Sequence, residues 1–271
     1  MRRLLKAQAS EIGTFVEPFA GGASVALQLA AEGTVRRIIL ADVDDLIASF
    51  WTTAAFDTTW LIDAMWDLEV SVSEWERFRA STPSSTRDKA LKCLFLNRTS
   101  YSGILHHRAG PIGGKRQTGP NLINCRFSKE TLHNRIAKVG LLAQTGSLTA
   151  VWNTDWKDTV ARATTSCSSS IGTLLFYCDP PFYAKAQDLY RYAFTHADHA
   201  TLASALRTLE SSWLLSYDDH AEVRKLYLDH ANNGSQLIMF AAEYRASAAS
   251  RRATELLVTN LPVTVIPEGL P

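Results

Sequence analysis

The sequence lacks paired cysteines and long apolar runs. It has four cysteines in 271 residues, none in a C-x-x-C pair and none with a histidine at zinc-ligand spacing. We therefore expect buried free cysteines in a reducing compartment, with neither a disulfide framework nor a metal site. No stretch approaches the roughly 20 apolar residues of a transmembrane helix, and Met1–Lys6 has no apolar signal core. These absences predict a cytoplasmic chain without a membrane partner.

The chain also has little net charge, but its charges are unevenly placed. The formal net charge is +1, which excludes a basic arm or an acidic tail as the dominant feature. Between Asn97 and Lys138, however, eight Lys and Arg accompany a single acidic residue, Glu130, so the rest of the chain is net acidic. A concentrated basic segment with histidines and glycines suits contact with nucleic-acid phosphates. The alternative is a solvated surface loop.

The order of apolar runs and turns predicts an open α/β sheet. A β-prone run over 14–19 leads through Gly21-Gly22 into a helix over 23–32 and a second strand over 35–40, with Asp44 as a cap for the next helix. Residues 52–98 are helical in pattern with a break at 81–85, and residues 99–127 form a long loop. Strands are expected at 147–151, 173–178, 213–217, 236–241 and 255–259, the last two as a hairpin, with helices at 196–209 and 221–229 and a polar connection at 164–170.

A nucleoside ligand is one interpretation of the first turn and the acid after the second strand. Glycines in the segment Glu17–Ser24 let the backbone approach a ligand, and the following helix begins with free N–H groups. Asp42 is placed to accept hydrogen bonds from two ribose hydroxyls. A tight structural turn and a helix N-cap explain the two features separately, but the combination favours a nucleoside.

Asp179-Pro180-Pro181-Phe182 follows an apolar strand, at the sheet edge where ligands bind in open α/β folds. The prolines stiffen this turn. The carboxylate of Asp179 and the carbonyl of Pro180 are two acceptors that can hold both hydrogens of an exocyclic amino group and direct its lone pair toward an electrophile. Phe182 can stack on a base that has left the duplex. A rigid strand-end turn without chemistry is the alternative.

Together these residues resemble the Dam-like, D-P-P-Y-type DNA adenine-N6 methyltransferases. The tetrapeptide at 179–182 has Phe in place of Tyr, which keeps the stacking ring. Six or seven motifs occur in the family's order and cover nearly the whole chain; they are Glu17–Ser24, Leu40–Asp42, Phe95–Gly103, Asp155–Trp156, Asp179–Phe182, Ser216–Asp219 and Glu255–Asn260. The resemblance implies a Rossmann-like, S-adenosylmethionine-dependent methyltransferase sheet with an inserted helical DNA-recognition region.

The resemblance also implies roles for particular residues. Cofactor contacts fall to Glu17, Phe19, Gly21, Asp42, Asp155 and Asp179, with Asp155 as a reader of the cofactor's adenine; Asp179, Pro180, Pro181 and Phe182 carry the chemistry. Candidates for DNA contact are Asn97, Arg98, Arg108, Lys115, Arg116 and Arg126. The catalytic domain is expected at 1–52 and 145–271, and the target-recognition region at 53–144.

One departure keeps other functions open. The family's usual K-W-x-G-G-K segment has no counterpart ahead of the first strand. The predicted function is transfer of methyl groups from S-adenosylmethionine to adenine N6 in double-stranded DNA; the alternatives are an RNA adenine methyltransferase and a non-catalytic DNA-binding protein. The sequence leaves open the recognition site, the oligomeric state and whether a restriction system accompanies the protein.

Overall fold

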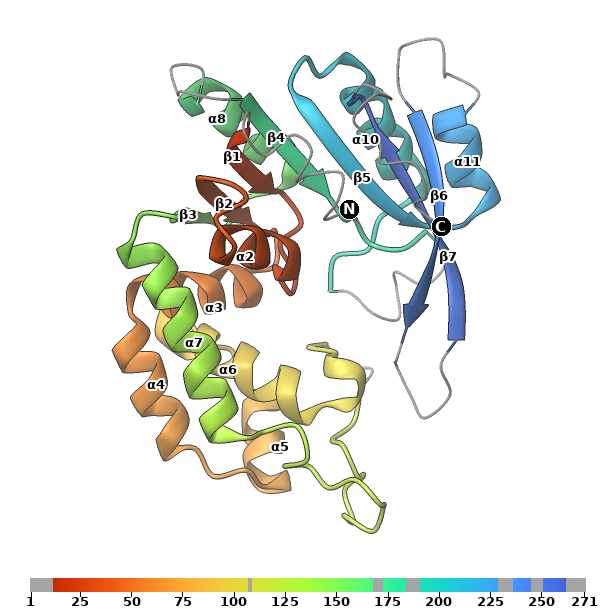
Figure 1. Ribbon diagram of the computed structural model, residues 1–271. Helices are drawn as coiled ribbons and strands as arrows, with labels where there is room; N and C mark the ends of the chain where they lie inside the picture. Colours follow the sequence, from red (N-terminus) through yellow and green to blue (C-terminus); the bar gives the residue numbers. More distant parts are fainter. Residues whose placement is uncertain are drawn as a thin grey trace.

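A seven-stranded sheet with helices on both faces forms the centre of the computed structural model (Figure 1). The structure describes residues 12–106, 109–167, 173–183, 191–228, 236–244 and 251–261, with the backbone alone for 236–244 and 251–254. The strands lie in the order β3-β2-β1-β4-β5-β7-β6. Their bounds are Ile12–Glu17 (β1), Arg37–Ala41 (β2), Leu148–Trp152 (β3), Thr173–Cys178 (β4), Ser212–Asp218 (β5), Gln236–Tyr244 (β6) and Arg251–Thr259 (β7).

The five strands from β3 to β5 run parallel, and the last two complete the sheet as an antiparallel hairpin. β7 pairs antiparallel with β5 and with β6. The chain first builds from β1 toward β2 and β3 and later continues on the other side of β1 with β4, so the order of winding reverses between β1 and β4. In open parallel sheets, ligands bind at the carboxyl ends of the strands beside such a reversal. The predicted Rossmann-like sheet and its final hairpin are confirmed.

Period-two alternation along the strands divides the core between the two faces of the sheet. In β2, Ile38 and Leu40 join one buried cluster, whereas Ile39 joins the other. In β5, Leu214 and Leu215 divide in the same way. Strands buried on both faces read as continuous apolar runs, which is why the sequence identified them.

Hydroxyl and carboxylate side chains begin most of the helices. Asp44 caps α3 by accepting the N–H of Leu46, as predicted, and a capping box of Thr195 and Asp198 begins α10. Serines cap α5, α6 and α7. The helix bounds are Ser24–Ala31 (α2), Asp45–Phe56 (α3), Thr58–Asp67 (α4), Val72–Ala80 (α5), Thr86–Thr99 (α6), Lys129–Gln144 (α7), Trp156–Cys167 (α8), His196–Thr208 (α10) and Ala221–Leu228 (α11), with a short 3-10 turn at Tyr101–Gly103.

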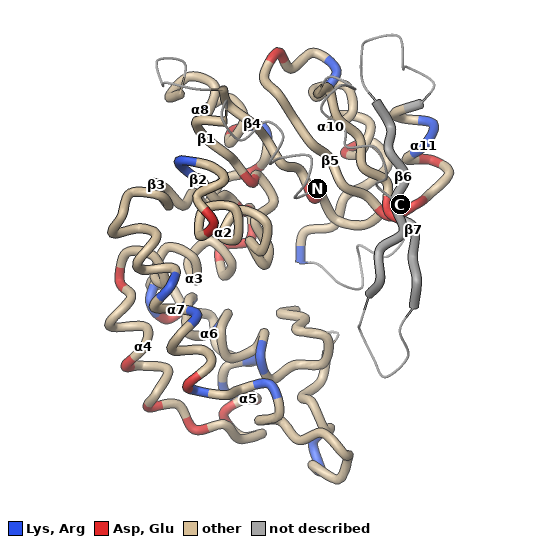
Figure 2. The backbone as a smooth tube through the Cα atoms, in the orientation of Figure 1, with Lys and Arg blue, Asp and Glu red and all other residues tan. Residues whose placement is uncertain are grey.

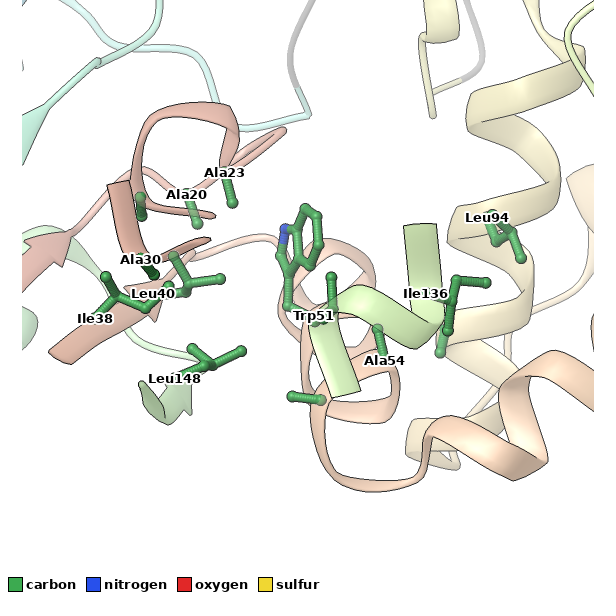
Figure 3. Close-up of a cluster of buried hydrophobic side chains, with 14 of the residues drawn as sticks. Ala20, Ala23, Ala30, Ile38, Leu40, Trp51, Ala54, Leu94, Ile136 and Leu148 are labelled. Carbon is green, nitrogen blue, oxygen red and sulfur yellow. The ribbon is translucent and has the colours of Figure 1, made fainter. Parts of the chain in front are cut away.

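The helices between β2 and β3 share the core of one sheet face. The first cluster contains Leu40 and Leu148 of the sheet, Trp51 and Ala54 of α3, and Ile136 of α7 (Figure 3). The predicted boundary between residues 52 and 53 falls inside α3. The division into a catalytic and a recognition region stays a prediction, and its two parts share one continuous hydrophobic core.

From β3 to β5 the structure departs from prediction at one connection and agrees at one helix and one strand. The polar connection predicted at 164–170 is wrong for residues 164–167, because they belong to α8, which ends at Cys167. Residues 168–170 lie outside the described residues. Trp156, Thr159 and Ala163 form the buried face of α8 at helical spacing, and this face was overlooked because two of its three residues are small. Helix α10 and strand β5 lie within one residue of their expected bounds.

Among the described residues, no helix has both the length and the apolar character of a membrane span.

Candidate active site and nucleic-acid interface

The turn after β1 is an open backbone surface tied to its neighbours by long-range hydrogen bonds. Gly21 has φ of 44°, a left-handed conformation that suits glycine. Its N–H donates to Oδ2 of Asp42 at 2.9 Å, and its carbonyl accepts the indole N–H of Trp51 at 2.9 Å. No atom lies within 4 Å of a Cβ built at Gly21 or Gly22, so this side of the turn faces open space. A ligand can therefore approach the backbone closely.

Asp42 holds the turn and the start of the next helix together. Its Oδ1 accepts the N–H of Asp44 at 2.8 Å, while Oδ2 accepts that of Gly21. Burial raises the pKa of Asp42 to about 6 against the opposing effect of these two hydrogen bonds. Asp44, and not Asp42, is the N-cap of α3, so the alternative interpretation of Asp42 as a helix N-cap is wrong. Each carboxylate oxygen of Asp42 has a further lone pair with which to accept a ligand hydroxyl.

Glu17 ends β1 inside the protein. Its Oε1 accepts the N–H of Ala26 at 2.9 Å, which satisfies a backbone group in the first turn of α2, where no side chain caps the helix. The pKa of Glu17 is raised to about 8, chiefly by burial and in smaller part by the charge of Asp179, against the opposing effect of the Ala26 hydrogen bond. The carboxyl group is therefore largely neutral at pH 7. Its predicted contact with a cofactor stays a prediction.

Phe19 and Asp155 occupy two other predicted cofactor positions. Phe19 is half-buried, and its ring packs edge-on against Phe194, with centroids 5.7 Å apart. Asp155 is exposed, and its Oδ1 accepts the N–H of Asp158 at 2.9 Å at the start of α8. A helix-capping role is thus present for Asp155, and its contact with an adenine stays a prediction.

The turn after β4 presents one carboxylate on a buried base. Pro180 and Pro181 are buried, Phe182 is half-buried and Asp179 is exposed. Oδ1 of Asp179 accepts the hydroxyl of Ser216 at 2.8 Å. Desolvation by the surrounding protein raises the pKa of Asp179 even though its side chain borders open space, and the Ser216 hydrogen bond acts in the opposite direction. β1 and β4 are paired in parallel, and the charge of Asp179 raises the pKa of Glu17, so the ends of the two strands share one electrostatic environment.

Strand β5 fixes this turn at a second point. The N–H of Tyr183 donates to Oδ1 of Asp218 at 3.0 Å, and the Tyr183 hydroxyl shares a 2.8 Å hydrogen bond with Nδ1 of His196. The ring of Tyr183 stacks on His220, with centroids 4.4 Å apart. Sequence reasoning identified the Ser216–Asp219 motif but gave it no role; the structure shows that Ser216 and Asp218 anchor the two ends of the Asp179–Tyr183 turn.

Three of the predicted DNA-contact residues lie together where α6 ends. The guanidinium of Arg98 donates through Nε to the carbonyl of Arg126 at 2.9 Å, and Arg126 donates to the carbonyl of Asn97 at 3.4 Å. Asn97 is exposed and its amide donates to the carbonyl of Gly103 at 3.3 Å. Burial lowers the pKa of Arg98, and the nearby Arg126 and Arg135 lower it further. Arginines concentrated in this way suit an anionic ligand.

The remaining predicted DNA contacts differ in their surroundings. Lys115 forms an exposed ion pair with Glu76 at 2.8 Å, whereas Arg116 is exposed and Arg108 lies outside the described residues. In Figure 2, Lys and Arg positions recur along α6, α7 and the segment between them. Arg79 orders part of this segment by donating to the carbonyls of Leu105, His106 and Ala109. Over its described residues, the predicted loop at 99–127 is thus irregular apart from the 3-10 turn, and Arg79 ties part of it to α5.

Comparison with known proteins gives one family match. Residues 2–110 match the family model described as D12 class N6 adenine-specific DNA methyltransferase. A search of curated proteins gave no match. The matched segment contains the Gly21 turn, Asp42 and the end of α6, and it stops before Asp179.

Proposed function

We propose that this chain, an N6 adenine-specific DNA methyltransferase of the D12 class by its match over residues 2–110, holds S-adenosylmethionine beside the Gly21 turn and acts on adenine at Asp179. The observation that carries the proposal is the parallel pairing of β1 with both β2 and β4, which brings the Gly21 turn, Asp42 and Asp179 to the same edge of the sheet. The family implies the donor, and the site residues are our assignment.

The residues at the Gly21 turn fit the nucleoside part of this cofactor. The turn has an open backbone side, and the Asp42 carboxylate lies one hydrogen bond away from it. Asp42 would accept the ribose hydroxyls, and Phe19 would contact the cofactor from the turn. Glu17, Gly21 and Asp155 complete the proposed set. When bound, S-adenosylmethionine supplies an electrophilic methyl group on a positively charged sulfur.

Asp179 and Pro180 would hold the amino group that receives the methyl. The lone pair of adenine N6 is delocalised into the ring, which makes the free amine a poor nucleophile. The Asp179 carboxylate and the Pro180 carbonyl would each accept one N–H, which turns the lone pair out of the ring and stabilises the positive charge that develops on nitrogen. Buried Pro181 stiffens the turn, and Phe182 would stack on the flipped base.

Double-stranded DNA would lie along the basic segment. Arg98, Arg126 and Arg116, with Asn97, would contact phosphates or base edges, and Lys115 would exchange its exposed partner Glu76 for a phosphate. Arg108, outside the described residues, belongs to the same proposed surface. Because phosphate contacts supply much of the affinity, binding should weaken as salt increases.

The test uses labelled S-adenosylmethionine with mixed-sequence duplex DNA and with structured RNA. Label in N6-methyldeoxyadenosine after digestion supports the proposal. Label in RNA alone would favour an RNA methyltransferase, and label on cytosine or on protein would defeat the adenine assignment. Calorimetric titration with S-adenosylmethionine separates an enzyme from a non-catalytic DNA-binding protein, which would show no binding.

Asp179→Ala should reduce methyl transfer by about two to three orders of magnitude, the usual effect of removing a group that stabilises transition-state charge. DNA affinity, measured by fluorescence anisotropy, should change little. Asp63→Ala, at an exposed position of α4, is the matched control and should retain full activity. Full turnover by the Asp179 variant would rule out its catalytic role.

A further inference from the structure

A hydrogen-bond chain of two hydroxyls leads to Asp179 from the neighbouring strands. Ser216 of β5 donates to Oδ1 of Asp179 at 2.8 Å, and the hydroxyl of Tyr177, on β4, lies 2.9 Å from Oγ of Ser216. Parallel pairing aligns the two strands, with Tyr177 opposite Leu214 and Cys178 opposite Leu215. The register therefore brings Ser216 beside the residue that follows Cys178.

The directions of the two hydrogen bonds follow from the number of protons. A serine hydroxyl has one hydrogen, and Ser216 gives it to the carboxylate. Ser216 must then accept the hydrogen of Tyr177 in the second bond. The chain is directional, from the Tyr177 hydroxyl through the Ser216 hydroxyl to the carboxylate of Asp179.

Burial keeps the hydrogen-bond chain from Tyr177 to Asp179 in one protonation state. Ser216 and Tyr177 are buried, with exposed fractions of 5% and 7%. Burial raises the pKa of Tyr177 above its ordinary value, with a further increase from Asp179, so the phenol stays protonated and remains a donor across the working pH range. The ring of Tyr177 stacks on Phe15 at a centroid distance of 6.1 Å, which limits the movement of the hydroxyl.

The hydrogen-bond chain leaves one carboxylate oxygen of Asp179 for a ligand. Ser216 occupies Oδ1 of Asp179, and within the described ranges Oδ2 has no hydrogen-bond donor. Asp179 is exposed as a residue, whereas Ser216 and Tyr177 behind it are buried. Ser216 thus occupies one carboxylate oxygen from the buried side, and the other oxygen stays available to a ligand.

We propose that Ser216 is a positioning residue for methyl transfer, which orients Asp179 through a hydroxyl that Tyr177 holds in place. The proposal rests on the proposed function, because it assigns the orientation of Asp179 to the acceptor role described there. Without Ser216, the carboxylate can rotate away from the amine that it must hold. The hydroxyl also stabilises the ionised form of Asp179, which is the form that accepts an N–H.

Several titratable groups surround Asp179 and bear on the pH dependence. They are Glu17 from β1, Tyr177 and Cys178 from β4, Tyr217 from β5 and Glu255 from β7, each with a pKa that Asp179 raises. None of them donates a hydrogen bond to Asp179 within the described part of the chain; Ser216 does. Loss of Ser216 should therefore raise the pKa of Asp179, and activity that needs the carboxylate should then require a higher pH.

The experiment measures the pH profile of kcat for Ser216→Ala with duplex DNA and S-adenosylmethionine. We expect kcat to fall about 10- to 100-fold, the range for a hydrogen bond to a charged group, while both KM values change less than about threefold. The acid limb of the profile should move to higher pH. Ser216→Thr keeps a hydroxyl and should restore both kcat and the position of the acid limb.

Tyr177→Phe provides a second, independent variant if Ser216→Ala does not fold. It should lower kcat about two- to tenfold by loss of a neutral hydrogen bond and move the acid limb in the same direction. In Ser216→Ala the change should add nothing further, because Tyr177 acts through Ser216. Tyr227→Phe is the matched control, since the buried Tyr227 hydroxyl has no hydrogen-bond partner among the described residues.

The outcomes separate this proposal from the proposed function. If the wild-type protein does not methylate adenine, the proposed function fails. If it does, and the acid limb stays in place in both Ser216→Ala and Tyr177→Phe, the positioning role is overturned while the function stands. Loss of activity in Ser216→Ala that Ser216→Thr does not restore, with an unmoved acid limb, also overturns it.

Discussion

Glu17 is a carboxyl group that the fold keeps away from water. Its pKa is raised from 4.5 to about 8, chiefly by burial. Between these values the folded protein binds a proton that the unfolded chain has released, so the free energy of unfolding falls as pH increases from about 4.5 to about 8. The carboxyl therefore stabilises the fold in mildly acidic solution and opposes it in mildly alkaline solution.

Glu17→Gln should flatten this dependence. Glutamine keeps an oxygen that can accept the N–H of Ala26 but cannot ionise. At about 1.4 kcal/mol per pKa unit, the difference in stability between variant and wild type should shift by a few kcal/mol in favour of the variant between pH 5 and pH 8. Urea unfolding at the two pH values measures it. Asp42 and Glu255, whose pKa values are also raised, remain in both proteins, so they largely cancel in the comparison.

An unchanged difference in unfolding free energy between the two proteins across this pH range would show that Glu17 is ionised in the folded state.

Individual residues at this site were visible in the sequence through their types and positions after strands. Their partners were not visible, because the contact of Asp179 with Ser216 spans 37 residues and that of Gly21 with Asp42 spans 21.

At the scale of elements, α4 and α7 meet at a position that admits no side chain. A Cβ added at Gly140 of α7 would lie under 3.0 Å from three side-chain atoms of Thr58, at the start of α4. A glycine inside a helix costs intrinsic stability, so close packing accounts for its presence here. This contact joins α4 to α7.

Gly140→Ala should lower the free energy of unfolding by about 1–3 kcal/mol through overpacking, in spite of the better helix propensity of alanine. Chemical denaturation measures the change. The penalty should shrink in a Thr58→Gly background, which removes the opposing atoms. Gly110→Ala, where no atom lies within 4 Å of the added Cβ, is the matched control and should be close to neutral. A stabilised Gly140 variant would contradict the close packing.

Elements differ in how well the sequence predicted them. Strands β2 and β4 were found because they are short apolar runs, and the start of α3 because Asp44 caps it. Helix α10 was also predicted, and the structure adds the Thr195–Asp198 capping box at its start. Helix α7 was not separately identified, although Ser128 caps it, because its buried residues Leu132, Ile136 and Val139 are diluted by polar neighbours. It becomes a defined element only by packing against α3 and α4.

At the scale of the whole molecule, positive charge is concentrated in one region while the total is close to zero. Arg116 is an exposed cation of this region, in the segment between α6 and α7. Arg37 is also exposed, but it is the first residue of β2, whereas Asp42 follows the last residue of that strand. Variants of the two arginines therefore distinguish how DNA binding depends on where a positive charge lies from how it depends on the net charge.

Arg116→Ala should weaken binding to duplex DNA about two- to tenfold and reduce the slope of log affinity against log salt by about one, as loss of one phosphate contact does. Anisotropy titrations at several salt concentrations provide both quantities. Arg37→Ala removes the same charge and should leave the slope as it is. Equal effects of the two variants would mean that net charge, rather than this surface, governs DNA binding.

The sequence by itself determined the type of fold, the starts of some helices and the set of candidate site residues, because each depends on a few neighbouring residues: alternating apolar positions, a capping side chain, or a carboxylate after a strand. Only the tertiary structure decided what holds those residues. The winding of β4 and β5 beside β1 brings Ser216 and Tyr177 to Asp179, and Trp51 reaches back to Gly21. Such contacts depend on strand register and helix packing, which no local pattern specifies.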